Sequence, residues 1–187
     1  MVALGLHLAA QTPLDETQSQ QLMTTLTEAA SSMQTMQCRF VQEKSSSMLA
    51  EPSVAEGVME YHAPDRLRWE YTSPSSFALV VDGEHIVKVS DDKTEVLEGN
   101  VGRMYQGMVN IIMGSASGKK MFDPTVFEVV LFDDDTFWKA VMTPKRRDMK
   151  RMFSQLVFRF DKKNNVISRV QLVESSGDVT SIRFEEF

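Results

Sequence analysis

The sequence predicts an α+β fold in which one large, curved antiparallel sheet is covered by an N-terminal helix and short lid helices. Apolar residues first recur at helical spacing, over residues 16–34. Many short segments that alternate apolar and polar residues follow, with turn residues between them. Connections this short suit antiparallel neighbours. We expect about 10–11 strands, and a sheet of that size tends to curl.

The N-terminal helix has a start signal and one apolar face. Asp15 followed by Gln18 is a capping box, in which each side chain bonds the free backbone N–H of the other residue. The apolar stripe that follows consists of Leu22, Leu26, Ala29 or Ala30, Met33 and Met36. This stripe is expected to face the sheet.

The first strands are closely spaced. They are expected at residues 36–49, 53–63, 66–73, 76–82 and 84–90. In the third, Leu67, Trp69 and Tyr71 point one way, and the polar residues between them point the other. The dipeptide Asp82-Gly83 between two apolar runs predicts a hairpin turn.

Residues 100–122 interrupt the strands. Helical spacing is seen for Met104, Met108, Ile111 and Ile112, and it is broken by Gly102, Gly107, Gly114 and Gly118. Glycine costs about 1 kcal/mol in a helix interior relative to alanine. We therefore expect one or two short helices that depend on packing, with the glycines acting either as hinges or as turn residues.

Strands resume at about residue 126 and continue to the C-terminus. Turn residues separate them at 163–165 and 176–178, and Gly57 in the earlier strands is expected to form a β-bulge. The apolar face that these strands share carries Leu67, Trp69, Tyr71, Phe77, Leu79, Leu156, Phe158, Phe160, Val170, Leu172, Ile182 and Phe184.

This apolar face must be covered, and two interpretations of it remain open. A tightly packed lid makes the face an ordinary core, whereas a loosely packed lid leaves an apolar cavity. The 13 methionines of the chain favour the cavity slightly, because flexible, polarizable side chains suit surfaces that accept varied apolar partners.

The N-terminus is similar to the end of a secretory signal. A short apolar run ends in Ala9 and Ala10, although no Lys or Arg precedes it. We expect export, with cleavage near Ala10, so that residues 1–10 are a signal remnant and residues 11–187 form a single domain. A short helical turn or a disordered end is the alternative.

Patterns typical of catalysis or metal binding are sparse. Cys38 is the only cysteine, which excludes an internal disulfide. Cys38 with His62, and Asp82 with His85, are the candidate reactive pairs. No nucleophile elbow, phosphate loop or HExxH motif is present. We therefore expect neither enzyme activity nor a metal or cofactor, and the net charge of −6 argues against nucleic acid.

Two charged clusters leave a protein-interaction or sensor module as a rival interpretation. The basic cluster, residues 143–153, carries Lys145, Arg146, Arg147, Lys150 and Arg151, and the acidic cluster, residues 132–137, carries Asp133, Asp134 and Asp135. The basic cluster suits a partner or anionic lipid head groups. Solvated hairpin tips are the simpler explanation of both.

One ordered series of residues resembles the LolA family, the periplasmic carriers of outer-membrane lipoproteins. The series is Phe40, Gln42, Lys44, Gly57, Pro64, Arg68, Trp69, Pro74, Asp82 and Gly83. The resemblance implies an incomplete antiparallel barrel, closed by helices, whose apolar cavity receives acyl chains. It also implies a periplasmic location, and an inner-membrane lipoprotein-releasing complex and an outer-membrane acceptor as partners.

The resemblance places Leu67 and Trp69 on the cavity wall. The full set of residues expected to bind the ligand is Phe40, Leu67, Trp69, Tyr71, Phe77, Leu79, Met104, Met108, Ile112 and Phe158. We expect a monomer that carries an acylated lipoprotein or lipid. A lipid-binding or sensor protein of the same fold, with a glycolipid, free lipid or protein partner, is the alternative. The family has an arginine where this chain has Ala63, so its way of closing the lid does not transfer.

Overall fold

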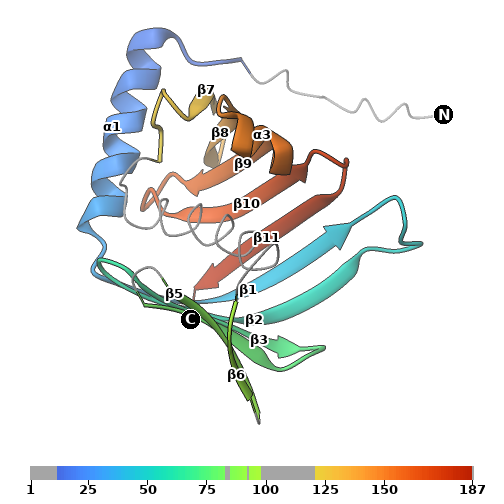
Figure 1. Cartoon of the computed structure of the whole chain (residues 1–187). Helices are drawn as coiled ribbons and strands as arrows, with labels where there is room; N and C mark the ends of the chain where they lie inside the picture. Colours follow the sequence, from blue (N-terminus) through green and yellow to red (C-terminus); the bar gives the residue numbers. More distant parts are fainter. Residues whose placement is uncertain (1–11, 83–84, 92, 98–120, 187) are drawn as a thin grey trace, which may run out of the picture.

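The computed structural model describes residues 12–82, 85–91, 93–97 and 121–186, and its main feature is one antiparallel sheet of 11 strands (Figure 1). The elements are α1 (Glu16–Ser32), β1 (Thr35–Ser45), β2 (Ser53–His62), β3 (Arg66–Ser73), β4 (Phe77–Asp82), β5 (His85–Ser90), β6 (Lys93–Val96), β7 (Phe127–Asp133), β8 (Phe137–Pro144), α3 (Arg147–Met152), β9 (Phe153–Asp161), β10 (Ile167–Glu174) and β11 (Val179–Glu186). The fold class predicted from the sequence is confirmed.

The strand order across the sheet is β6-β5-β4-β3-β2-β1-β11-β10-β9-β8-β7. Consecutive strands therefore lie side by side, except that β6 and β7 are at opposite ends of the sheet. The pairing of β1 with β11 joins the two halves. Strands β6 and β7 are the two ends of this open, curved sheet, and α1 lies beside β7–β10 (Figure 1).

Helix α1 begins where the sequence predicts. The Asp15 side chain accepts a hydrogen bond from the Gln18 backbone, and the Gln18 side chain accepts one from the Asp15 backbone. The stripe is confirmed at its buried residues Leu22, Leu26 and Ala30. The helix ends at Ser32, two residues before the predicted 34, because Met33 takes an extended conformation and caps it.

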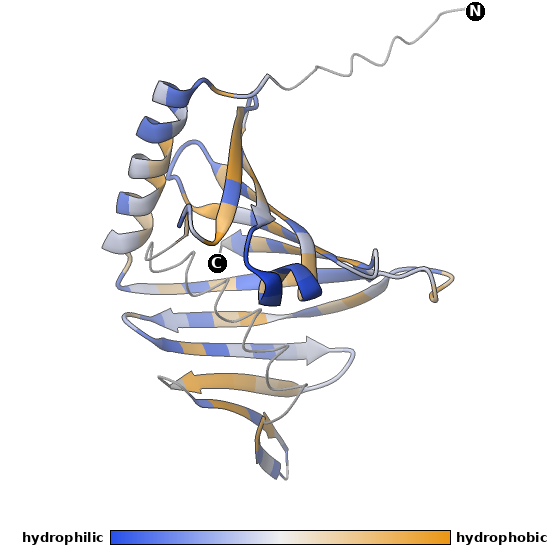
Figure 2. Ribbon diagram, turned by 45° about the horizontal axis from the view of Figure 1, so that its top comes forward, coloured by the Kyte–Doolittle hydropathy of each residue, from blue (hydrophilic) through white to orange (hydrophobic). Residues whose placement is uncertain are grey.

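The strands alternate as the sequence predicts, and Figure 2 shows the alternation of hydropathy along them. Leu67, Trp69 and Tyr71 of β3 are buried, and the neighbouring Arg66 and Arg68 are exposed. Because side chains of a strand alternate between faces, Leu67, Trp69 and Tyr71 all reach the inner side of the curved sheet.

The predicted turns and the bulge are also present. Asn165 has a φ of 59° and Gly177 a φ of 94°, the left-handed conformation that Asn and Gly adopt most readily. The register between β2 and β3 shifts at Gly57. Asp82 pairs with His85, which confirms the hairpin between β4 and β5.

Two elements were not predicted. The four-residue strand β6 pairs with β5 at the edge of the sheet. Helix α3 occupies the basic cluster, for which a solvated hairpin tip was the simpler expectation. The signal remnant at 1–10 and the lid segment around Met104, Met108 and Ile112 lie outside the described residues.

Buried side chains form two clusters on the inner side of the sheet. The helix-side cluster joins α1, Met121 and strands β7–β10. The strand-side cluster is built from strands β1–β5 and β11, and none of its described residues comes from a helix. Phe184 packs against both clusters. The sheet therefore presents one half that α1 covers and one aromatic half that no described helix covers.

Candidate functional site: an aromatic face and a methionine-lined pocket

Aromatic rings from three strands meet in the strand-side cluster. The ring of Phe40 stacks on Trp69 with centroids 4.2 Å apart, and it meets Tyr71 edge-on at 5.3 Å. Tyr71 in turn stacks on Phe77 at 4.7 Å. Contacts of this geometry stabilise beyond the area they bury. The result is a continuous apolar surface across β1, β3 and β4.

Two residues of the series that resembles the LolA family, Gly57 and Gln42, contact the rings of this surface. Gly57 leaves room for Phe40, because a Cβ there would lie 2.6 Å from Phe40 Cζ. The Tyr71 hydroxyl donates a hydrogen bond to Gln42 Oε1 at 3.0 Å. Two motif positions, Gly57 and Gln42, thus hold the rings of Phe40 and Tyr71 in place.

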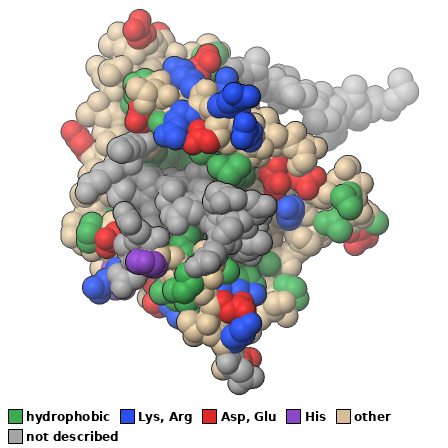
Figure 3. All heavy atoms as spheres, in the orientation of Figure 1, with side chains coloured by type: hydrophobic (Ala, Val, Ile, Leu, Met, Phe, Trp, Pro, Cys, Tyr) green, Lys and Arg blue, Asp and Glu red, His purple; other side chains and the backbone are tan. Residues whose placement is uncertain are grey.

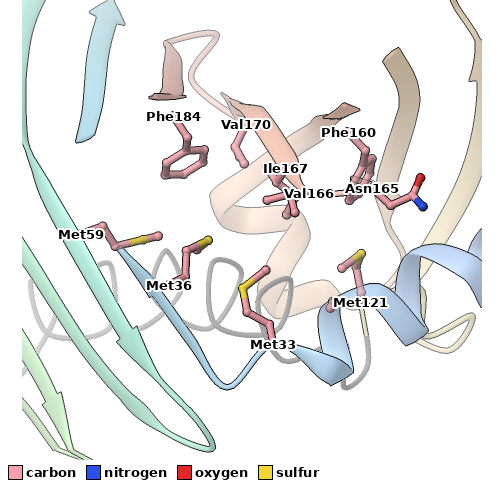
Figure 4. A pocket seen from close by; sticks show the side chains of 11 residues that line it. Met33, Met36, Met59, Met121, Phe160, Asn165, Val166, Ile167, Val170 and Phe184 are labelled. Atoms are coloured by element: carbon pink, nitrogen blue, oxygen red, sulfur yellow. The ribbon is translucent and has the colours of Figure 1, made fainter. Parts of the chain in front are cut away.

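A small apolar pocket lies where the two clusters meet (Figure 4). The residues that line it are Ala30, Met33, Met36, Met59, Met121, Phe160, Asn165, Val166, Ile167, Val170 and Phe184. Its volume is about 30 Å³, and a water molecule needs roughly 10–15 Å³ on the same measure. The pocket is too small for an acyl chain, so a larger ligand must displace side chains.

Four methionines make such a displacement easy. Met33 comes from the end of α1, Met36 from β1 and Met59 from β2, while Met121 precedes β7. Figure 4 shows their sulfur atoms gathered toward one space. Methionine has three rotatable bonds and adapts to irregular apolar shapes. The pocket wall is therefore adjustable where the clusters meet.

The structure brings most of the predicted ligand-binding residues together. Phe40, Leu67, Trp69, Tyr71 and Leu79 are buried in the strand-side cluster, and Phe77 packs against it. Phe158 belongs to the helix-side cluster instead. Met104, Met108 and Ile112 are outside the described residues, so their role stays a prediction.

The pocket itself was missed by the site prediction. None of the predicted binding residues in the described part of the chain is among its lining residues. The available signals were the methionine count and the alternation that puts Met59 on the same face as Tyr61. Met33 and Met36 were assigned to one helical stripe, whereas the helix ends at Ser32, Met33 is its extended C-cap and Met36 lies in β1.

Position 63, where the family has an arginine, has a structural role here. The Ala63 backbone N–H donates to the Gln34 carbonyl oxygen at 2.8 Å, and the side chain packs against the strand-side cluster. This contact ties the turn after β2 to the connection between α1 and β1. An alanine side chain offers no hydrogen-bond donor that could close a lid.

The candidate reactive pair Cys38 and His62 is not assembled. Cys38 lies opposite Met59 on the inner side, and His62, three residues along the same strand as Met59, is exposed on the other face. Burial raises the pKa of the Cys38 thiol to about 11, so it stays protonated at neutral pH. His85 is exposed beside the β4–β5 turn.

The two charged clusters lie on the surface. Lys145, Arg146, Arg147, Lys150 and Arg151 around α3 are exposed, and Figure 3 shows Lys and Arg side chains gathered at the top of the molecule. Arg146 forms an ion pair with Asp148. In the acidic cluster, Asp133 forms an ion pair with Lys162.

Within the described residues, no group of three His, Cys, Asp or Glu side chains could hold a metal ion. Among the described helices, none has both the length and the apolar character needed to span a membrane.

The open antiparallel sheet, with helix α1 and two apolar clusters on its inner side, defines an α+β protein built on one large curved sheet. The family model described as outer membrane lipoprotein carrier protein LolA matches residues 31–187. The chain therefore belongs to the LolA family.

Relatives with this description are moderately similar. Outer-membrane lipoprotein carrier proteins of Methylobacillus flagellatus and Chromobacterium violaceum are 26% and 28% identical over 132 and 133 residues, which is 70% and 71% of this chain. The matches span 60% and 61% of those relatives. Among solved structures, the Mycobacterium tuberculosis lipoprotein LppX has a TM-score of 0.53 at 11% identity, covering 91% of this chain and 95% of that one. This last similarity shows the fold alone.

Proposed function

We propose that the protein is a periplasmic carrier that shelters the acyl chains of lipoproteins and delivers them to the outer membrane. The observation that carries the proposal is the strand-side cluster, an aromatic surface that continues into a methionine-lined pocket. Each methylene buried from water gains about 0.8 kcal/mol. An acyl chain would displace the methionine side chains and lie along the aromatic rings.

Membership of the LolA family supports the same cargo, because the relatives are lipoprotein carrier proteins. The carrier role would require an inner-membrane lipoprotein-releasing complex as donor and an outer-membrane acceptor as recipient. Loading and release would shift the population between closed and open forms. We propose that the carrier acts as a monomer and has no enzymatic step.

Binding of a fluorescent diacylated cysteine peptide tests the proposal. Met33 and Met36 line the pocket and are only partly buried, so Met33→Glu or Met36→Glu places a charge in the pocket with little effect on folding. We expect each variant to bind the peptide at least about tenfold more weakly, because desolvating a carboxylate costs several kcal/mol. Met48→Glu is the matched control, since Met48 is 91% exposed.

The result separates a carrier from a protein that only shares the fold. Loss of binding in the pocket variants but not in Met48→Glu would support the carrier. Failure of the wild-type protein to bind any acylated peptide would contradict it. Native mass spectrometry of the protein purified from its own periplasm, with organic extraction, would then identify the cargo as lipoprotein, glycolipid or free lipid.

A sensor or binding protein with a protein partner is the second candidate, and the basic surface of α3 favours it. Arg147, Lys150 and Arg151 are exposed, and the described residues provide no ion-pair partner for them. Met149 and Met152 pack against the helix-side cluster, which turns the cations outward. A partner that docks there should be lost when all three cations are changed to glutamate, while binding of acylated peptide persists.

A further inference from the structure

Trp69 carries a buried hydrogen-bond donor that no described residue pairs with. The side chain is 0% exposed, and its Nε1 atom has no hydrogen-bond partner among the residues that the structure describes. An indole N–H can only donate, and the large majority of buried polar side-chain atoms are paired. Such an unpaired donor therefore calls for a specific explanation.

The neighbours of Trp69 explain why no acceptor reaches it. Phe40 stacks on one side of the indole, and Phe184 meets it edge-on at 6.1 Å. In the sheet, Trp69 lies between Met59 of β2 and Leu79 of β4. These four side chains are apolar. Tyr71 is a further neighbour, with ring centroids 6.4 Å apart, and its hydroxyl donates to Gln42. Among the described residues, none accepts a hydrogen bond from the indole N–H.

Two of these neighbours also line the pocket. Met59 is the partner of Trp69 in the β2–β3 register and Phe184 meets the indole edge-on, and both of them line the pocket. A ligand that enters by displacing methionine side chains would come up against Trp69. The unpaired donor thus adjoins the part of the protein where an apolar ligand is expected.

We propose that the Trp69 indole N–H donates a hydrogen bond to a carbonyl oxygen of an ester- or amide-linked acyl chain. The inference rests on the proposed function, and it specifies which end of the ligand lies at Trp69. The carbonyl is the polar atom group nearest the hydrocarbon in such a chain. With the carbonyl at Trp69, the hydrocarbon lies toward the methionines, and the protein selects acyl chains over alkyl chains.

A matched pair of ligands tests this selectivity on the full chain. One is a fluorescent cysteine peptide whose glyceryl group carries two palmitoyl esters, and the other is its dihexadecyl ether analogue, which lacks both ester carbonyls. We expect the wild-type protein to bind the ester about tenfold more tightly, as for one buried hydrogen bond. Trp69→Phe keeps an aromatic ring and should lose the preference, so that the variant binds the ester and the ether equally.

Indole NMR provides a second test that needs no variant of Trp69. The chain has two tryptophans, and Trp138→Phe assigns their indole N–H resonances. The ester ligand should move the Trp69 resonance downfield, and the ether should not.

Each outcome is decisive. If the wild-type protein binds ester and ether equally, or if Trp69→Phe keeps the preference, the role of Trp69 is refuted while the carrier function stands. If the ester and the ether move the Trp69 indole N–H resonance alike, the hydrogen bond from Trp69 to a carbonyl is likewise refuted. If neither ligand binds the wild-type protein, both proposals are overturned.

Discussion

The ring of Phe40 lies against Gly57 of the neighbouring strand, where any side chain would collide with it. A Cβ at position 57 would lie 2.6 Å from Phe40 Cζ and 1.9 Å from the carbonyl oxygen of Glu70. The Phe40 ring is thereby free to stack on Trp69. The stacking of Phe40 on Trp69 therefore depends on the absence of a side chain at position 57 of β2.

Gly57→Ala should destabilise the protein strongly. The added methyl group must displace both backbone and ring, so the loss should exceed the roughly 1–3 kcal/mol that overpacking typically costs. Urea unfolding followed by circular dichroism measures the loss. Gly177→Ala is the control, because position 177 has nothing within 4 Å of a Cβ but a φ of 94°, which costs about 1–2 kcal/mol. Equal losses in the two variants would contradict the crowding at Gly57.

The hydrogen bond between Tyr71 and Gln42 predicts coupled stability effects. Tyr71→Phe leaves Gln42 Oε1 without this donor, and the bond contributes about 0.5–1.5 kcal/mol. Gln42→Ala should cost a similar amount. In the double variant the two losses should not add, because both remove the same interaction. Additive losses in urea unfolding would mean that the 3.0 Å contact contributes nothing.

Local sequence patterns predicted most of the fold. The alternation in β3 is strict, because Leu67, Trp69 and Tyr71 all reach the inner side. Strand β6 was missed because Lys93–Val96 is short and mostly polar, and it depends on pairing with β5. Helix α3 was missed because six residues give too little periodicity, and its Met149 and Met152 depend on packing against the helix-side cluster.

The pocket could not be predicted from local patterns. Met36 and Met59 lie in paired strands, and their proximity follows from the β1–β2 register, in which Met36 is opposite Tyr61 and Cys38 opposite Met59. Met121 reaches the same pocket from a distant segment. Register and long-range packing decide which methionines meet, and a sequence shows only that methionines are abundant.

The Cys38 thiol predicts a loss of stability at high pH. Its pKa is raised from 9.0 to about 11 by burial, so the unfolded chain releases the proton first. The stabilising effect is complete below pH 9 and is lost as the pH rises toward 11. Over that interval the wild-type protein should lose up to about 2–3 kcal/mol relative to Cys38→Ala.

Urea unfolding of both proteins between about pH 8 and about pH 11, from one unit below to two units above the ordinary thiol pKa of 9.0, measures this difference. Other titrating groups are common to the two proteins and cancel in the comparison. The constant cost of the alanine cavity cancels as well. Parallel stability curves would show that the native thiol titrates as it does in the unfolded chain.

Phe184 joins the two clusters, and its removal should open the pocket. Phe184→Ala deletes a ring that lines the pocket and packs against both clusters. Removing a fully buried phenylalanine ring costs about 3–5 kcal/mol, so for the partly buried Phe184 we expect a smaller loss. The enlarged pocket should bind an apolar fluorescent probe such as N-phenyl-1-naphthylamine more tightly.

Leu26→Ala is the control for this last variant. Leu26 is 0% exposed in the helix-side cluster and does not line the pocket, so its loss of about 2–5 kcal/mol should leave probe binding unchanged. If both variants gained affinity equally, the probe would be reporting a loosened core. If only Phe184→Ala binds the probe more tightly, the probe occupies the pocket where the two clusters meet, because Phe184 lines that pocket and Leu26 does not.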